Sequence, residues 1–240
     1  VPPGKERKNL PLVVLVHGGP WARDTYGFDP QVQFMANRGY AVLQINYRGS
    51  TGYGRDFYKK GFRVVGTAMQ EDIEDATRWT MARGIADPKR VAIMGGSFGG
   101  YSTLMGLIRT PDLYCCGIDV AGVTNWIDII KHGGALNPTG FAFNVDRIGD
   151  PVKDAEALRA ISPVFHVDRI QSPLLIVHGR DDDVVPYDQA KDLVEALDKA
   201  GKSYEMVAKF NEPHGIYNYK NRIDFYKQVE AFLTKHMPAD

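Results

Sequence analysis

The feature that most constrains this chain is a glycine-rich segment around a serine, Val91-Ala-Ile-Met-Gly-Gly-Ser-Phe-Gly-Gly-Tyr101. It opens with an apolar run, 91–94, that is typical of a buried strand, and it continues into an apolar segment, 101–108, that can form a helix. Its centre fits the pattern G-x-S-x-G, in which a serine lies on a sharp turn between a strand and a helix. Side chains at the flanking glycines would crowd such a turn, and the helix N-terminus favours negative charge. The segment therefore predicts a strand, a tight turn that presents Ser97, and a helix.

Strand-like and helix-like segments alternate along the whole chain. This alternation favours an α/β fold, with a mostly parallel central sheet and helices on both faces. Strands are expected at 10–16, 40–47, 91–94, 117–122, 174–177 and 204–210. One helix is expected to end at 34–38, and four others are expected at 69–82, 101–108, 188–200 and 219–236. A turn is expected at Asp87-Pro88. The irregular part, about 123–172, predicts a small lid-like insertion over the sheet. With 240 residues and no internal repeat or linker, residues 1–240 are predicted to form a single domain.

Composition argues against several classes of protein. Lys and Arg together number 29 and Asp and Glu number 29, so the formal net charge is zero and no nucleic-acid partner is expected. No apolar run approaches the roughly 18 residues that a bilayer requires, so no membrane partner is expected either. The two cysteines, Cys115 and Cys116, are adjacent and cannot form a stabilising disulfide framework. Metal-binding patterns and a phosphate-binding glycine loop are absent, so neither a metal nor a cofactor is implied.

The N-terminal segment bears on location. Residues 1–8 are polar and lack the apolar core of a signal peptide, which favours a cytoplasmic protein. The chain begins with Val and not Met, so it can also be a piece of a longer protein whose targeting segment has been removed.

Ser97 has downstream partners in an order that suits nucleophilic catalysis. A serine hydroxyl needs a base to take its proton, and the base needs a carboxylate to orient it. The cluster Asp181-Asp182-Asp183 follows one predicted strand and His214 follows the next, so all should share the carboxyl edge of the sheet with Ser97. The order serine, acid, histidine is that of α/β-hydrolases. Spacing alone does not separate the three aspartates.

Six histidines compete for the role of base, and only His214 has both the expected order and a loop position after a strand. His17 and His178 precede glycines at strand ends, where bracing a turn is the simpler role. His132 and His166 lie in the irregular insertion, and His236 lies in the last predicted helix.

Five motifs together resemble the catalytic domain of the prolyl oligopeptidase family of serine peptidases, with the acylaminoacyl peptidases as the most similar group. They are His17-Gly-Gly-Pro20, Asn46-Tyr-Arg-Gly-Ser-Thr-Gly-Tyr-Gly54, Gly95-Gly-Ser-Phe-Gly-Gly-Tyr101, His178-Gly-Arg-Asp-Asp-Asp-Val-Val-Pro186 and His214-Gly215. The resemblance implies an α/β-hydrolase fold. It also implies that the catalytic carboxylate is Asp182, three residues after the glycine of the His-Gly pair. Asp181 and Asp183 are then solvated or structural neighbours.

The resemblance also bears on the oxyanion hole and the substrate pocket. The N–H of Phe98, directly after the nucleophile, is the general donor of this fold. The resemblance implies one of two second donors: the N–H of Gly19, as in acylaminoacyl peptidases, or the hydroxyl of Tyr53, as in prolyl oligopeptidases and dipeptidyl peptidases. We favour Gly19, because the amino-acid sequence of the 48–54 loop resembles that of the acylaminoacyl peptidases. Three aromatic residues of the insertion can line an apolar substrate pocket, and ordinary packing is an equally good explanation for them: Trp126, Phe141 and Phe143.

The predicted function is a serine hydrolase that cleaves peptide or acylaminoacyl bonds through an acyl-enzyme. One alternative is a carboxylesterase for small or aromatic esters with the same triad, and another is a catalytically silent binding module. Members of the family usually carry a β-propeller, and none is present in these 240 residues. A propeller in a longer parent chain is therefore one expected partner, while an open site without it favours the esterase, because remote binding energy supports turnover. The sequence gives no indication of oligomeric state.

Overall fold

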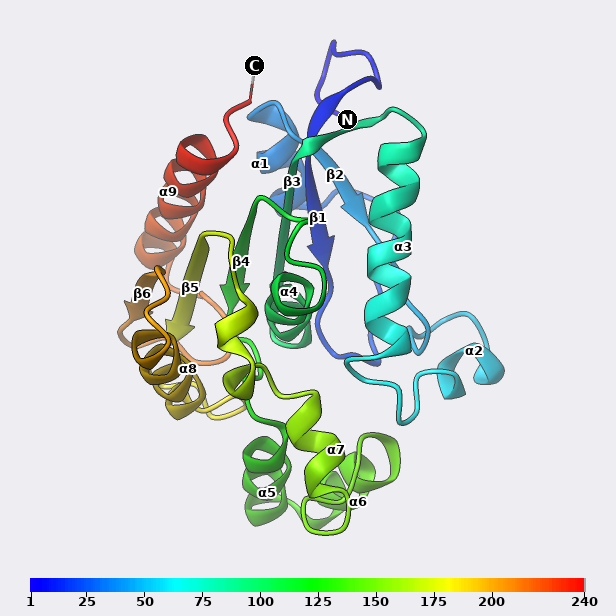
Figure 1. Ribbon diagram of the computed structural model, residues 1–240, viewed down its shortest axis with the longest axis vertical. Helices are drawn as coiled ribbons and strands as arrows, with labels where there is room; N and C mark the ends of the chain where they lie inside the picture. The colour runs from blue at the N-terminus through cyan, green and yellow to red at the C-terminus, as the bar shows by residue number, and fades with distance from the viewer. Residues whose placement is uncertain (240) are drawn as a thin grey trace.

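A parallel sheet between two layers of helices forms the frame of this protein (Figure 1). The computed structural model describes residues 1–239. Within that range the sheet has six strands, β1 (Leu10–Val16), β2 (Ala41–Gln44), β3 (Ala86–Gly96), β4 (Cys116–Val120), β5 (Leu174–Gly179) and β6 (Glu205–Lys209), in the order β2-β1-β3-β4-β5-β6. Every neighbouring pair is parallel. The predicted α/β fold with a mostly parallel sheet is confirmed.

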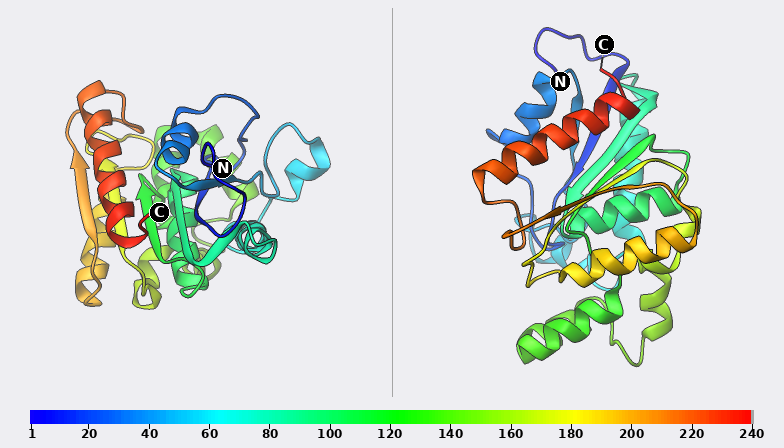
Figure 2. Two further views of the ribbon diagram at one scale, coloured as in Figure 1. Left: turned by 90° about the horizontal axis from the view of Figure 1, so that it is seen from above. Right: turned by 90° about the vertical axis from the view of Figure 1, so that its left-hand side faces the viewer.

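Helices cover both faces of the sheet (Figure 2). One face carries α3 (Ala68–Ala82), α4 (Phe98–Arg109) and α8 (Tyr187–Lys199), and the other carries α1 (Pro30–Asn37) and α9 (Tyr219–His236). Side chains of β1 alternate between the two cores: Leu12 and Val14 pack toward the first face, Val13 and Leu15 toward the second. Because successive strand residues point to opposite sides, a continuous apolar run such as 10–16 serves both cores at once.

The insertion between β4 and β5 lies beyond the carboxyl ends of the strands, at the lower end of Figure 1. It contains α5 (Trp126–Leu136), α6 (Pro138–Arg147) and α7 (Ala155–Ala160), followed by the short helical turns η1 (Pro163–Phe165) and η2 (Val167–Arg169). The short helix α2 (Arg55–Lys59) lies at the side of the same end, whereas both termini lie at the opposite end. Among residues 1–239, no helix is both long enough and apolar enough to cross a bilayer.

Several boundaries differ from the predicted ones. The predicted turn at Asp87-Pro88 is wrong, since β3 begins at Ala86, which pairs with Leu10 across an irregularity in the register. Proline is tolerated where ladder hydrogen bonds are already interrupted. Helix α1 begins at Pro30 because the Asp29 carboxylate caps it, accepting hydrogen bonds from the next turn's backbone N–H groups. Strand β2 is shorter than predicted, and α4 begins directly after Ser97.

Candidate active site

Ser97 occupies a strained turn between β3 and α4. Its φ of 58° lies in the left-handed region that side chains rarely adopt, and its N–H donates to the Val120 carbonyl at 2.8 Å. Glycines around it permit close packing: a Cβ added at Gly99 would lie 2.0 Å from the Val16 carbonyl oxygen, and one at Gly95 would lie 2.5 Å from the backbone of Gly99. The sequence therefore needs glycine at these two positions in order to hold Ser97 at the carboxyl edge of the sheet.

Backbone N–H groups lie beside this serine. Phe98 is the first residue of α4, so its N–H has no partner within the helix. The turn after β1 packs against Ser97 from the other side, since a Cβ at Gly18 would lie 4.0 Å from the Ser97 Oγ. In the next residue, Gly19, φ is +122°, and within residues 1–239 its N–H has no hydrogen-bond acceptor. His17 braces this turn, stacking on the Tyr47 ring with 4.3 Å between the ring centroids.

A buried carboxylate holds the histidine that follows β6. Oδ2 of Asp182 lies 2.7 Å from Nδ1 of His214, and the Asp182 side chain is fully buried. Its Oδ1 accepts hydrogen bonds from the N–H groups of Val184 at 3.0 Å and Val185 at 2.8 Å. Burial opposes ionisation of Asp182, but hydrogen bonds from His178, His214 and Val185 outweigh it and hold the pKa of this carboxyl well below its usual range. An ionised carboxylate only accepts, so the His214 Nδ1 carries the proton and its Nε2 is left as an acceptor.

The loop that carries His214 is fixed by a second buried carboxylate that sequence reasoning missed. Glu212 is completely buried and accepts hydrogen bonds from the N–H groups of Tyr217 at 2.8 Å and Asn218 at 3.0 Å, and from the Asn221 amide at 2.7 Å. Its carbonyl oxygen accepts from the Asp181 N–H at 3.1 Å, which ties the histidine loop to the acidic loop. An acid two residues before the expected base was the available signal.

The other acids and histidines lie elsewhere. Asp181 and Asp183 are exposed, and the Asp183 carbonyl oxygen lies 3.2 Å from Nε2 of His132. His166 is 3.2 Å from the Arg159 carbonyl, and His236 lies at the opposite edge of the sheet. His178 is buried on β5 at 2.8 Å from the Val185 carbonyl.

A cavity of about 460 Å³ opens beside Ser97. Its wall includes Gly19 and Phe98, together with the insertion residues Trp126 and Phe143. Much of the remaining wall is apolar and was not predicted, because such residues cannot be told from ordinary core in a sequence: Trp21, Val123, Ile129, Ile148 and Val185. The arrangement can therefore bring an apolar group next to the serine hydroxyl.

Of the residues predicted for the oxyanion hole and the substrate pocket, two do not line this cavity among the described residues. Phe141 packs instead against the helix α5, where a Cβ at Gly134 would lie 2.7 Å from its ring. Tyr53 is 53% exposed, packs on Phe57, and its hydroxyl accepts a hydrogen bond from the Asn46 amide at 2.8 Å.

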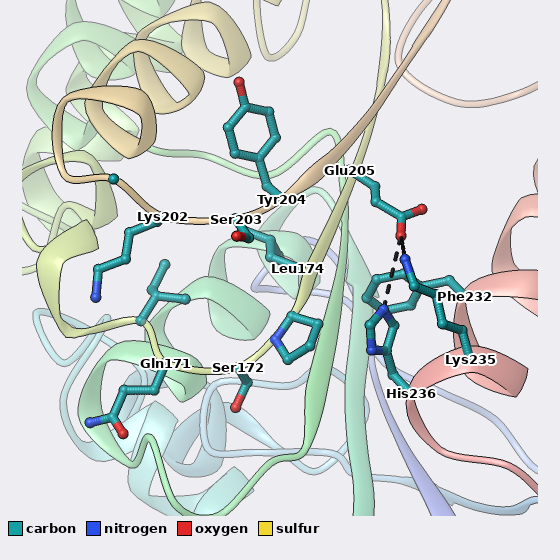
Figure 3. Close-up of a pocket in the computed structure, with 13 residues that line it drawn as sticks. Gln171, Ser172, Leu174, Lys202, Ser203, Tyr204, Glu205, Phe232, Lys235 and His236 are labelled. Atoms are coloured by element: carbon teal, nitrogen blue, oxygen red, sulfur yellow. Dashed lines mark hydrogen bonds and ion pairs between the residues drawn. The ribbon is translucent and has the colours of Figure 1, made fainter.

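A second cavity, of about 360 Å³, lies at the amino ends of β5 and β6 (Figure 3). Its wall includes Ser172 and Ser203 and the end of α9. The Lys235 ammonium donates to Glu205 at 2.8 Å, and His236 lies 3.9 Å from the same carboxylate oxygen. Among the described residues, neither serine hydrogen-bonds to this carboxylate or to His236; the Ser172 hydroxyl donates instead to the Tyr114 carbonyl oxygen at 2.6 Å.

The comparison with protein families decides the identity of the fold. A family profile described as "Prolyl oligopeptidase family" matches residues 26–239. This chain belongs to the prolyl oligopeptidase family. The prediction made from the five motifs is thereby confirmed.

Two curated relatives within the family are named as dipeptidyl peptidases. Dipeptidyl aminopeptidase BIII of Pseudoxanthomonas mexicana is 40% identical, covering 97% of this chain and 34% of that protein. Dipeptidyl peptidase family member 6 of Caenorhabditis elegans is 39% identical, covering 93% of this chain and 31% of that protein. This chain thus spans about a third of the length of these relatives.

Solved structures of the family have the same fold. A puromycin-hydrolyzing peptidase of Mycobacterium tuberculosis superimposes with a TM-score of 0.92 at 30% identity, covering all of this chain and 36% of that one. An acylaminoacyl peptidase in complex with Z-Gly-Gly-Phe-chloromethyl ketone gives a TM-score of 0.89 at 31% identity, covering all of this chain and 39% of that one. The α/β-hydrolase fold that the family resemblance implied is therefore confirmed.

Proposed function

We propose that this chain is the catalytic part of a serine peptidase that cleaves peptide or acylaminoacyl bonds through an acyl-enzyme. The observation that carries the proposal is the 2.7 Å contact between His214 and the buried Asp182, at the same edge of the sheet as a serine held at a φ of 58°. Membership of a family of serine peptidases supports it. The proposal assigns the nucleophile to Ser97, the base to His214 and the orienting acid to Asp182.

The steps follow from the chemistry of these groups. His214 accepts the hydroxyl proton of Ser97 through Nε2 while the serine oxygen attacks the scissile carbonyl. Asp182, which is ionised and fully buried, stabilises the imidazolium that forms. His214 then returns the proton to the leaving amine, and water repeats the sequence on the acyl-enzyme.

The oxyanion of the tetrahedral intermediate needs donors that are already oriented. Phe98 N–H at the start of α4 is one, and the helix N-terminus adds favourable charge. For the second donor we favour the N–H of Gly19, because it lines the cavity and has no acceptor within residues 1–239. Tyr53 would have to turn from its exposed position toward the cavity to serve in its place.

The cavity limits the class of substrate. Its apolar wall, with Trp126 and Phe143, suits an apolar side chain on the acyl side of the scissile bond. The two relatives named as dipeptidyl peptidases favour substrates with a free amino terminus, and the acylaminoacyl peptidase structure favours blocked ones. Both kinds therefore belong in the test.

The test compares three chromogenic substrates on the purified protein and on Ser97→Ala. They are a dipeptidyl p-nitroanilide, an N-acetylaminoacyl p-nitroanilide with the same apolar residue, and the corresponding p-nitrophenyl ester. Amide turnover that disappears in Ser97→Ala is the expected result. Turnover of the ester alone would favour a carboxylesterase. Failure of a phosphonate probe to label Ser97, with no turnover of any substrate, would favour a silent binding module.

A further inference from the structure

A second histidine approaches the carboxylate that we assign to the triad, and the proposed mechanism does not use it. His178 lies on β5, and its side chain is 1% exposed. Its Nε2 is 2.8 Å from the Val185 carbonyl oxygen and 3.5 Å from Oδ2 of Asp182. That oxygen is the one that His214 contacts at 2.7 Å. Two histidines therefore converge on one oxygen of one buried acid.

The protonation of His178 follows from its partner. A carbonyl oxygen only accepts hydrogen bonds, so the Nε2 of His178 carries a hydrogen and donates it to Val185. The same residue, Val185, donates its own N–H to Oδ1 of Asp182 at 2.8 Å. His178 thus fixes the backbone at Val185, which in turn donates to Asp182. It also places the positive end of its Nε2–H dipole near Oδ2 of Asp182, the oxygen that contacts His214.

The groups around His178 make this a closed environment. On β4, Asp119 is buried and accepts a hydrogen bond from the Gly122 N–H at 2.9 Å. On α8, the Tyr187 ring lies edge-on, with 5.8 Å between ring centroids. Burial lowers the pKa of His178, but the nearby carboxylate of Asp182, the hydrogen bond to Val185 and the charge of Asp119 outweigh it and raise that pKa.

We propose that His178 is a positioning residue for catalysis, which fixes the place of Asp182 and limits the strength of the hydrogen bond between Asp182 and His214. The inference rests on the function proposed above. With His178 present, Oδ2 of Asp182 interacts with two histidines, so its electrostatic interaction with His214 is weaker than it would be with His214 as the single histidine partner. Without it, Oδ2 of Asp182 would keep His214 as its one histidine partner, while the segment around Val185 would lose its anchor on β5.

These two consequences have different signatures. A carboxylate that is no longer shared stabilises the charged imidazole of His214 more strongly. The activity of a base grows as it loses its proton, so the acid limb of the pH profile of kcat/KM moves to higher pH. A less firmly held Asp182 lowers kcat at all pH values. A residue that only filled space would affect stability and leave the acid limb where it was.

The experiment uses two substitutions that differ in one group. His178→Leu removes the donor, and His178→Gln retains an amide N–H near the position of Nε2. For His178→Leu we expect kcat to fall about tenfold, in the range found when outer partners of metal-bound histidines are removed. We expect the acid limb to move upward by about half a pH unit. His178→Gln should recover most of kcat and return the acid limb to the wild-type position.

A spectroscopic measurement gives a readout independent of turnover. The Nδ1 proton of His214, shared with Asp182, should resonate at low field in the proton NMR spectrum, and His178→Leu should shift it while His178→Gln should not. Unchanged kcat, acid limb and resonance in His178→Leu would overturn the inference. So would a loss of kcat that His178→Gln does not recover. Should the Leu variant fail to fold, His178→Asn replaces it, because its shorter amide cannot reach Val185.

Failure of the proposed function would look different. In that case wild-type turnover would survive in Ser97→Ala, or would be absent. Turnover that needs Ser97 but is insensitive to His178 would refute only the role of His178.

Discussion

Two cavities of this protein lie at opposite edges of one sheet and are similar in size, but the polar groups near them differ in their exposure to water. At the carboxyl edge the acid and the histidine beneath it are shielded from water: the Asp182 and His178 side chains are 0% and 1% exposed. At the amino edge Lys235 forms an ion pair with Glu205 (Figure 3). These two side chains are open to solvent, at 64% and 43% exposure. Charged groups acquire unusual chemistry only where water is excluded, so cavity volume is a poor guide to function.

The difference follows from the direction of the strands. In a parallel sheet every strand delivers its following loop to the same edge. Here the turn at Gly19 follows β1, Ser97 follows β3, Asp182 follows β5 and His214 follows β6. The amino edge receives only the returns from helices, such as the turn at Gly201 after α8. The loops that follow the strands therefore meet at the carboxyl edge, where Ser97, Asp182 and His214 lie.

The most direct test of the difference between the two cavities is to replace one serine at each edge of the sheet. Ser97→Ala should lower kcat by about 10⁴- to 10⁶-fold, because loss of the nucleophile leaves only binding and oxyanion stabilisation. Ser203→Ala, in the amino-edge cavity, should leave kcat within about twofold of wild type, since surface changes away from a site have small effects. Turnover measured at equal protein concentration checks both variants, and circular dichroism confirms their folds. Comparable losses at the two edges would refute the assignment.

Among the three aspartates 181–183, substitution of one alone should cause a large loss of kcat. Asp182→Asn should lower kcat by about 10⁴-fold, because an amide cannot hold His214 in the required tautomer. Asp181→Asn and Asp183→Asn replace exposed carboxylates and should each cost less than about threefold. The three variants are compared at one pH with the same amide substrate. Equal losses would mean that the buried contact with His214 is not the functional one.

Features of the fold and the site that depend on residues close together in the sequence could be predicted from the sequence. The strand, turn and helix around Ser97 depend on neighbouring residues, and the sheet order places Asp182 and His214 at the predicted edge. Spacing alone left three aspartates open, and the family resemblance singled out Asp182. The structure places this residue on His214, whereas its two neighbours face solvent.

Other features depend on which loops meet, which no local pattern reports. The buried Glu212 ties two loops that are about thirty residues apart in sequence, and His178 gains its second contact only because the chain folds back at Val185. Phe141 and Phe143 are two residues apart on α6, yet only Phe143 reaches the cavity. Helix α1 was partly missed because its start depends on a cap at Asp29 rather than on apolar periodicity.

A measurement of stability against pH sharpens the contrast between buried and solvated acids. Burial raises the pKa of Asp119 from its ordinary 3.8 to about 7, so between these values the folded protein holds a proton that the unfolded chain has released. Stability should therefore fall as pH rises through this window, by up to a few kcal/mol. Asp119→Asn should flatten the slope, because the amide does not ionise and can still accept from Gly122.

The amino edge supplies the control for that measurement. Glu205→Gln removes a solvated carboxylate from its ion pair with Lys235 and should change the free energy of unfolding by less than about 1 kcal/mol. Asp182 acts in a separate window, since a lowered pKa costs stability only as pH falls below the ordinary value of 3.8. Urea unfolding at several pH values checks these expectations. A slope that persists in Asp119→Asn would assign it to another group.

The smallest expected effect concerns the wall of the cavity beside Ser97. Phe143 lies edge-on to Trp21 at 5.2 Å between ring centroids, and the Arg147 guanidinium lies 3.8 Å from the centre of its ring. Phe143→Ala removes an aromatic contact of about 1 kcal/mol and part of the apolar wall, so KM for an apolar amide substrate should rise about fivefold with kcat nearly unchanged. Phe141→Ala, two residues away and outside the cavity, should lower stability without changing KM. If Phe141→Ala raised KM as much as Phe143→Ala, the insertion would influence substrate binding through its overall rigidity, and the position of one ring on the cavity wall would not be the cause.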